Sequence, residues 1–105
     1  MNTFSIAIHG GAGTLVKGLM TLELETEYKL ALKNARDKGY ETLNQGGSAL
    51  DAVEVAVKLL EDSPLFNAGR GAVFTAEGTH EMDASIMDGK TTEAGAVSLI
   101  TGIKN

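Results

Sequence analysis

The chain has 105 residues, a formal net charge of -5 and no cysteine, a length that allows one small domain or a piece of a larger one. The negative charge argues against binding nucleic acid or an anionic membrane, and the lack of cysteine excludes disulfides, thiolate metal sites and a cysteine nucleophile. No apolar run is long enough to span a bilayer, so the sequence predicts a soluble cytoplasmic protein.

A strand is expected first, followed by a helix over residues 24–43. Phe4, Ile6 and Ile8 alternate with small or polar residues up to Gly10, which is the period of a strand. The helix is amphipathic, because its small and apolar residues recur at spacings of three and four: Leu24, Tyr28, Leu32, Ala35, Gly39 and Leu43. Either glycine of the "NQGG" that follows can adopt the left-handed cap.

A second helix is expected over residues 49–61, and Ser48 with Asp51 forms a capping-box-like start. Its polar residues form one thin stripe, so we expect burial on most sides. Pro64 prevents the helix from continuing.

The chain is β-like after Gly71, with short apolar or alternating runs in "AVFT", "MDASIMD" and "AGAVSLI". Asp88-Gly89 is a hairpin signal. The run "AGAVSLI" is apolar on both faces, so a strand here needs cover on both sides, and two helices cover only one. The sequence therefore indicates an incomplete domain.

The segment "HGGAG" has three open interpretations: a phosphate loop, a tight turn at a strand end, or glycines that let the backbone approach another segment closely. It matches neither the dinucleotide fingerprint nor the Walker pattern. His9 and His80 lack the spacing of a zinc site, so we interpret them as structural or solvated. Asp88 is assigned to turn chemistry, and Asp83 to no role beyond a possible buried hydrogen bond.

The loop "SPLFNAGRGAVF" follows the end of the second helix, where the last carbonyls lack intrahelical partners and the helix dipole is negative. A loop that curls back there could enclose a hard cation through oxygen atoms. The alternative is a cap completed by water. Asn67 likewise has two interpretations, turn chemistry or a polar group directed at an active site.

Four segments, "AIHGGAG", "GGSALDAVEVAVKLLED", "PLFNAGRGAVFT" and "EMDASIMDGKTTEAGAV", together resemble the amino-terminal part of the plant-type L-asparaginase and isoaspartyl peptidase family. The resemblance runs over residues 4–97. It implies an α/β fold that forms part of an αββα sandwich, the N-terminal-nucleophile hydrolase architecture. Residues 1–105 would then be an incomplete single domain, the beginning of the α subunit.

The resemblance also implies a precursor that cleaves itself before a threonine, which becomes the nucleophile of a second subunit. No catalytic residue is expected in this chain. Gly13-Thr14 and Gly78-Thr79 lack the family's sequence around the cleavage point, so neither is a credible nucleophile.

Three kinds of site residue follow from the resemblance. Asn67 is similar to an asparagine that lines the active site, with Phe66 anchoring its loop and two glycines permitting the tight path. Gly10 and Gly11 are similar to a loop that positions the scissile segment. The resemblance implies no organic cofactor. It does imply a structural Na⁺ bound by the main-chain carbonyls of six residues: Leu60, Glu61, Ser63, Phe66, Ala68 and Arg70.

The implied function is hydrolysis of L-asparagine and β-aspartyl dipeptides by the complete protein, with this chain inactive by itself. The implied partners are the remainder of the α subunit and the β subunit, in a dimer of αβ heterodimers, with no nucleic acid or membrane. The alternative is a non-catalytic fragment that acts only as a packing or self-association module. Substrate preference stays open.

Overall fold

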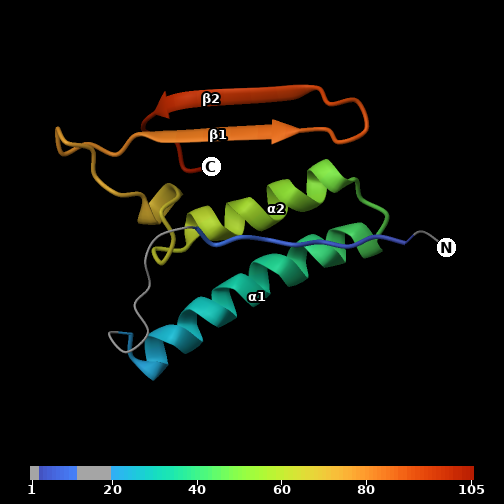
Figure 1. Cartoon of the computed structure of the whole chain (residues 1–105), viewed down its shortest axis with the longest axis horizontal. Coiled ribbons are helices and arrows are strands. Elements are labelled where there is room, and N and C mark those ends of the chain that lie inside the picture. The colour runs from blue at the N-terminus through green and yellow to red at the C-terminus, as the bar shows by residue number, and fades with distance from the viewer. Residues whose placement is uncertain (1–2, 12–19) are drawn as a thin grey trace.

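The computed structural model describes residues 3–11 and 20–105. Its elements, in chain order, are α1 (Leu22–Asn44), α2 (Ala49–Asp62), a 3-10 turn (Gly69–Gly71), β1 (Met82–Met87) and β2 (Ala94–Ile100). The two helices pack side by side, and the two strands form a hairpin on the other side of α2 from α1 (Figure 1). The predicted mixed α/β class is confirmed.

Helix α1 forms where the periodicity predicts it. The hydroxyl of Thr21 accepts a hydrogen bond from the Leu24 amide at 3.1 Å and caps its start, and Gly46 beyond its end has φ +89°. Ala35 and Gly39 are its buried residues. A Cβ added to Gly39 would lie 2.4 Å from Ile6 Cδ1, so this glycine lets the N-terminal segment press directly onto the helix.

Helix α2 begins with the predicted capping box: Ser48 Oγ accepts from the Asp51 amide at 3.1 Å, and Asp51 Oδ2 accepts from the Ser48 amide at 3.2 Å. Its buried residues are Ala52 and Ala56. The expected burial on most sides is wrong, because three apolar side chains of the helix are more than a third exposed: Val53, Val57 and Leu59. Within the described ranges, no element covers them.

The N-terminal segment is extended and lies along the helix pair (Figure 1). Its side chains alternate as predicted, with Phe4, Ile6 and Ile8 half-buried and the residues between them exposed. The Phe4 ring packs against Tyr40 of α1 at a centroid distance of 5.1 Å. The extended conformation and its inward face are confirmed, but in residues 3–11 no strand ladder is formed.

Strands β1 and β2 pair antiparallel in a two-stranded sheet. The turn role of Asp88 is confirmed, because its Oδ1 accepts from the Lys90 amide at 2.9 Å and its amide donates to the Glu93 carbonyl at 2.9 Å. Residues 72–75, predicted as β-like, form no strand.

An irregularity in the sheet explains Asp83. The pairing register shifts between Met82 and Ala84, and opposite this shift Leu99 has φ +52°. Asp83 Oδ1 accepts from the Leu99 amide at 2.9 Å and so satisfies a donor that the bulge removes from the ladder. The suggested hydrogen bond exists, but it is exposed rather than buried.

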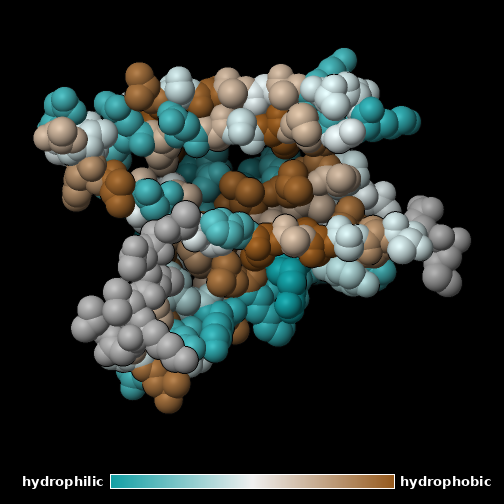
Figure 2. All heavy atoms as spheres, in the orientation of Figure 1, coloured by the Kyte–Doolittle hydropathy of each residue, from teal (hydrophilic) through white to brown (hydrophobic). Residues whose placement is uncertain are grey.

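Both faces of the hairpin are open. Every residue of β1 after Met82 and every residue of β2 before Ile100 is exposed, including apolar Ile86, Val97 and Leu99. Figure 2 shows apolar surface over α2 and in patches over the hairpin, with a hollow between them. The expectation that the helices cover one side of the strands is wrong. No helix in the described ranges is long and apolar enough to cross a membrane.

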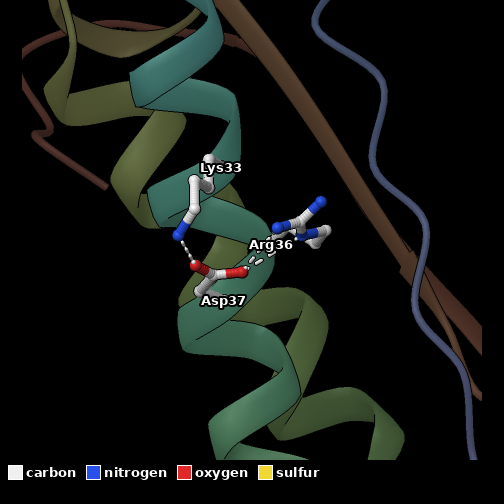
Figure 3. A network of polar contacts seen from close by, with 3 residues as sticks. All are labelled: Lys33, Arg36 and Asp37. Carbon is white, nitrogen blue, oxygen red and sulfur yellow. Dashed lines mark hydrogen bonds and ion pairs between the residues drawn. The ribbon is translucent and has the colours of Figure 1, made fainter.

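The outer face of α1 carries ion pairs, and one small network joins Lys33, Arg36 and Asp37 (Figure 3). The Asp37 carboxylate accepts from the Lys33 ammonium, and from Arg36 Nη2 at 2.9 Å and Nε at 3.1 Å. These hydrogen bonds hold the pKa of Asp37 below its usual value, and the bond from Lys33 has the largest effect.

We expect the Asp37 carboxyl to titrate at a lower pH in the folded chain than in the unfolded chain. The network therefore stabilises the fold above the unfolded-state pKa, and its contribution is lost as the pH falls through the folded-state pKa. An NMR titration of the Asp37 carboxyl carbon in the chain and in Lys33→Met measures this, and the midpoint should rise in the variant. Equal titration midpoints in the parent chain and in Lys33→Met would show that the ion pair between Lys33 and Asp37 does not persist in solution.

Candidate functional site

The loop after α2 turns back under the end of the helix. The Ser63 amide donates to the Leu60 carbonyl at 3.2 Å and closes the helix. Gly69 then returns to the same end with φ +52°, and a Cβ on it would lie 2.5 Å from the Glu61 carbonyl oxygen. Only glycine fits this approach, because both the backbone conformation and the contact exclude a side chain.

Gly71 is restricted by contact alone. A Cβ at this position would lie 2.1 Å from the Phe66 carbonyl oxygen and 2.7 Å from that of Pro64. Two backbone hydrogen bonds stabilise the turn. The Ala68 amide donates to the Phe66 carbonyl at 2.8 Å, and the Gly71 amide donates to the Ala68 carbonyl at 3.0 Å. The structure thus gives a physical reason for both glycines of "NAGRG", as the sequence predicted.

Phe66 anchors the loop in the small core. Its side chain is 5% exposed and meets the Tyr28 ring of α1 edge to face, with centroids 5.7 Å apart. A Cβ at Gly10 would lie 3.1 Å from both Phe66 Cε1 and Leu32 Cδ2. The Phe66 ring therefore joins the end of the N-terminal segment, α1 and the loop.

This contact favours one of the three interpretations of "HGGAG". Gly10 lets the backbone approach the Phe66 ring closely, and Gly11, at φ +122°, occupies a conformation that favours glycine. The His9 side chain is exposed, and its Nδ1 accepts from the Gly11 amide at 3.2 Å. The rest of the motif, from Ala12 onward, lies outside the described residues.

Asn67 is exposed beside the buried Phe66. Its Oδ1 accepts from the Val73 amide at 3.0 Å and so ties the two ends of the turn together. Within the described ranges no hydrogen bond engages its amide nitrogen, which keeps two donors available. The bond to Val73 supports the interpretation of Asn67 as a turn residue, although the sequence did not identify Val73 as its partner.

The residues predicted to bind sodium are brought to one region. Leu60, Glu61 and Ser63 end α2, and Gly69 carries the return of the loop onto the Glu61 carbonyl. The other three predicted ligands lie in this loop: Phe66, Ala68 and Arg70. Carbonyl oxygens near the negative end of a helix suit a hard cation. The carbonyls of Leu60, Phe66 and Ala68 each already accept a backbone hydrogen bond, and each has a second lone pair. Sodium binding stays a prediction.

A cleft of about 430 Å³ lies beside this loop. Four of its six lining residues are charged: Glu61, Asp62, Arg70 and Lys104. The Lys104 ammonium lies 3.8 Å from Asp62 Oδ1, and Gly69 and Ile103 complete the lining. Asn105 Nδ2 donates to Glu61 Oε2 at 3.0 Å and to Asp62 Oδ1 at 3.2 Å. In residues 3–11 and 20–105 no group of three or more histidine, aspartate or glutamate side chains could hold a metal ion.

Two threonines directly follow a glycine in the sequence, Thr14 and Thr79. Thr79 closes a turn that begins at Thr75: its carbonyl accepts from the Thr75 amide at 2.6 Å, and the two hydroxyls lie 2.8 Å apart. Thr14 lies outside the described residues. His80 stacks on the exposed Phe74 ring at a centroid distance of 4.1 Å, a contact that the sequence did not reveal.

Comparison with known proteins assigns the chain to a family. The sequence profile of the family described as Asparaginase matches residues 2–105. The isoaspartyl peptidase of Salmonella typhimurium is 50% identical over 105 residues, which is 100% of this chain and 34% of that protein. The isoaspartyl peptidase of Escherichia coli is 52% identical over 100 residues, 95% of this chain and 31% of that protein. A plant-type L-asparaginase of Pyrococcus horikoshii is 52% identical over 101 residues, 96% of this chain and 32% of that protein.

The chain thus spans about a third of the length of the curated relatives it matches. The likeness extends over nearly all of this chain, so it includes both helices, the glycine-bearing loop and the hairpin. The chain therefore belongs to the family of plant-type L-asparaginases and isoaspartyl peptidases.

Proposed function

We propose that this chain is the amino-terminal part of a hydrolase that cleaves β-aspartyl dipeptides and L-asparagine. The observation that carries the proposal is the identity of about half of all positions with proteins named isoaspartyl peptidase and L-asparaginase. The nucleophile is the N-terminal threonine of a second subunit, freed by self-cleavage and lying outside this sequence. The chain alone is therefore inactive.

The proposed reaction is acyl transfer in two steps. The threonine hydroxyl oxygen attacks the side-chain carbonyl of the substrate, its proton passing to the threonine's own amine. The C–N bond breaks, and ammonia or the amine of the second residue leaves with that proton. Water then hydrolyses the β-aspartyl ester and releases aspartate.

In this proposal the chain supplies the support of the active site. Phe66, buried against Tyr28, holds the loop in place, and Asn67 presents its free amide nitrogen to the reaction centre. Gly10 and Gly11 lie at the end of the segment that packs on Phe66 and position the scissile segment of the precursor. A sodium ion held by the carbonyls around Glu61 would stiffen the same loop.

The partners in the complete protein are the rest of the α subunit and the β subunit, assembled as a dimer of αβ heterodimers in the cytoplasm. A second candidate function is a non-catalytic packing or self-association module. The exposed apolar side chains on both faces of the hairpin favour it for this chain alone, because apolar surface of this kind marks association.

A chimera separates the two functions. The matching 100 residues of the Escherichia coli isoaspartyl peptidase are replaced by this chain, and the product is assayed for self-cleavage and for hydrolysis of a β-aspartyl dipeptide and of asparagine. The enzyme proposal expects two subunits by denaturing mass spectrometry and turnover of at least one substrate. A chimera that folds and cleaves itself but hydrolyses neither substrate would refute the proposal and leave the packing module.

Replacing Asn67 with alanine in this chimera should lower kcat/KM about ten- to a hundredfold, as expected for a contact worth roughly 1.5–3 kcal/mol in the transition state. Stability should fall by only about 1 kcal/mol, since one exposed hydrogen bond to Val73 is lost. Steady-state kinetics and urea unfolding give the two values.

The matched control is Asn67→Asp. It keeps an oxygen that can accept from the Val73 amide but removes the amide donors. Full stability with reduced turnover is expected. Unchanged turnover in either variant would restrict Asn67 to its role in the turn.

A further inference from the structure

The loop between β1 and β2 contains the sole Asp-Gly pair of the sequence, Asp88-Gly89, and the sequence contains no Asn-Gly pair. A backbone nitrogen that follows an aspartate can attack the side-chain carboxyl and close a five-membered ring. Glycine favours this reaction most, because it has no Cβ beside the attacking nitrogen. The other aspartates precede lysine, alanine or serine, at Asp37, Asp51, Asp62 and Asp83.

The structure places the two reacting groups together. Asp88 Oδ1 accepts from the Lys90 amide at 2.9 Å, and the ring closed by this hydrogen bond contains the Gly89 nitrogen. The carboxyl group is thereby folded back over the backbone atoms that would attack it. The hydrogen bonds of the loop hold the amide and the carbonyl of Asp88 itself, through Glu93 and Thr92.

The attacking group is accessible. Gly89 is exposed, and a Cβ at this position would meet nothing within 4 Å. In the described part of the chain no hydrogen bond engages the Gly89 amide. Neither a neighbouring side chain nor a ladder bond therefore opposes closure of the ring.

We propose that the Asp88-Gly89 bond is a site of spontaneous isomerisation to an isoaspartyl linkage. The Gly89 nitrogen forms a bond to Asp88 Cγ, the C–OH bond of the protonated carboxyl breaks, and water leaves with the amide proton. Water then opens the succinimide. Cleavage at Cγ restores aspartate, and cleavage at the main-chain carbonyl carbon leaves Gly89 attached through the Asp88 side chain. The net change in mass is zero.

The product would alter the hairpin. An isoaspartyl residue adds its Cβ to the main chain and moves the free carboxylate to Cα, so the hydrogen bond to Lys90 is lost. The extra backbone atom lies directly after β1, where the Asp88 amide bonds Glu93 and the ladder begins. This inference does not rest on the proposed enzymatic function.

The test is incubation of the full chain in heavy-oxygen water for several weeks, followed by digestion in ordinary water. We expect the peptide containing Asp88 to divide into two isomers that carry one heavy oxygen. The newly formed isomer should accept a methyl group from protein isoaspartyl methyltransferase. The digest is tryptic, so residues 39–58, which include Asp51 before an alanine, form a separate peptide. That peptide serves as the internal control and should stay unlabelled.

Two variants sharpen the result. Gly89→Ala should lose the label at position 88 without disturbing the loop, because the added methyl group meets open space and Gly89 does not have positive φ. Asp88→Asn should deamidate through the same ring, a change that intact mass reveals directly. The proposal is overturned if the label in the peptide containing Asp88 does not exceed that in the peptide containing Asp51, or if only a short synthetic peptide with this sequence reacts.

Discussion

Replacing Gly71 with alanine is expected to lower the free energy of unfolding by about 3 kcal/mol. A loss of this size is typical of a substitution that creates a steric clash with the backbone. A Cβ at this position would lie 2.1 Å from the Phe66 carbonyl oxygen, a distance that no rotamer can relieve because Cβ is fixed to the backbone. The turn must then open, and the hydrogen bond from Gly71 to Ala68 is lost with it.

Urea unfolding followed by circular dichroism measures the global effect. Hydrogen exchange of the Gly71 and Val73 amides reports the loop itself, and both should exchange faster in the variant. The matched control is Gly95→Ala in β2, where an added Cβ meets nothing within 4 Å. Its stability should stay within about 0.5 kcal/mol of the parent chain. Similar losses in both variants would show that the clash at Gly71 is not the cause.

The helices are the part of the fold that the sequence predicts well. Their signals are local: apolar residues at spacings of three and four, a capping box at Ser48 and a left-handed glycine at Gly46. Each signal acts within about four residues, so it operates before any distant contact forms. The two glycines of the loop were expected from the resemblance, but the contacts that require them, with Glu61 for Gly69 and with Pro64 and Phe66 for Gly71, are revealed only by the structure.

What the sequence could not predict depends on distant partners. The apolar side chains of Val53 and Val57 indicate a buried face, yet no described element lies against it. The N-terminal segment has the alternation of a strand but no neighbouring strand in the described ranges. The periodicity of a segment indicates which of its residues are suited to burial, but it does not indicate which other segment packs against them. Relatives about three times as long as this chain are consistent with cover from residues beyond this sequence.

The candidate site divides in the same way. The pairing of Phe66 with Gly10 joins residues far apart in the sequence, and only the structure reveals it. The resemblance singled out Gly10, Phe66 and Asn67 separately, and the structure gives two of them a common reason, the contact of one ring with one glycine. Asn67 has a bond to Val73 that explains its place in the turn, so its part in catalysis needs the separate test given above.

Phe66→Ala is expected to have the largest effect on stability, a loss of about 3–5 kcal/mol, which is typical of removing a buried aromatic ring. Phe66 is 5% exposed, and among the described residues the other buried apolar side chains are alanines. The ring therefore contributes a large share of the buried apolar area, and its loss also separates the loop from Tyr28 and Gly10.

A loss of this size is comparable with the whole stability of a small domain, so Phe66→Leu is measured beside it. Leucine keeps apolar contact with the backbone at Gly10 but lacks the edge-to-face contact with Tyr28, and a loss of roughly 1–1.5 kcal/mol is expected. Phe74→Ala is the matched control, since that ring is 68% exposed and should change stability by less than about 1 kcal/mol. Urea unfolding of the three variants gives the order. If Phe74→Ala costs as much as Phe66→Ala, the anchor of the loop is not where the structure places it, and the support proposed for Asn67 fails with it.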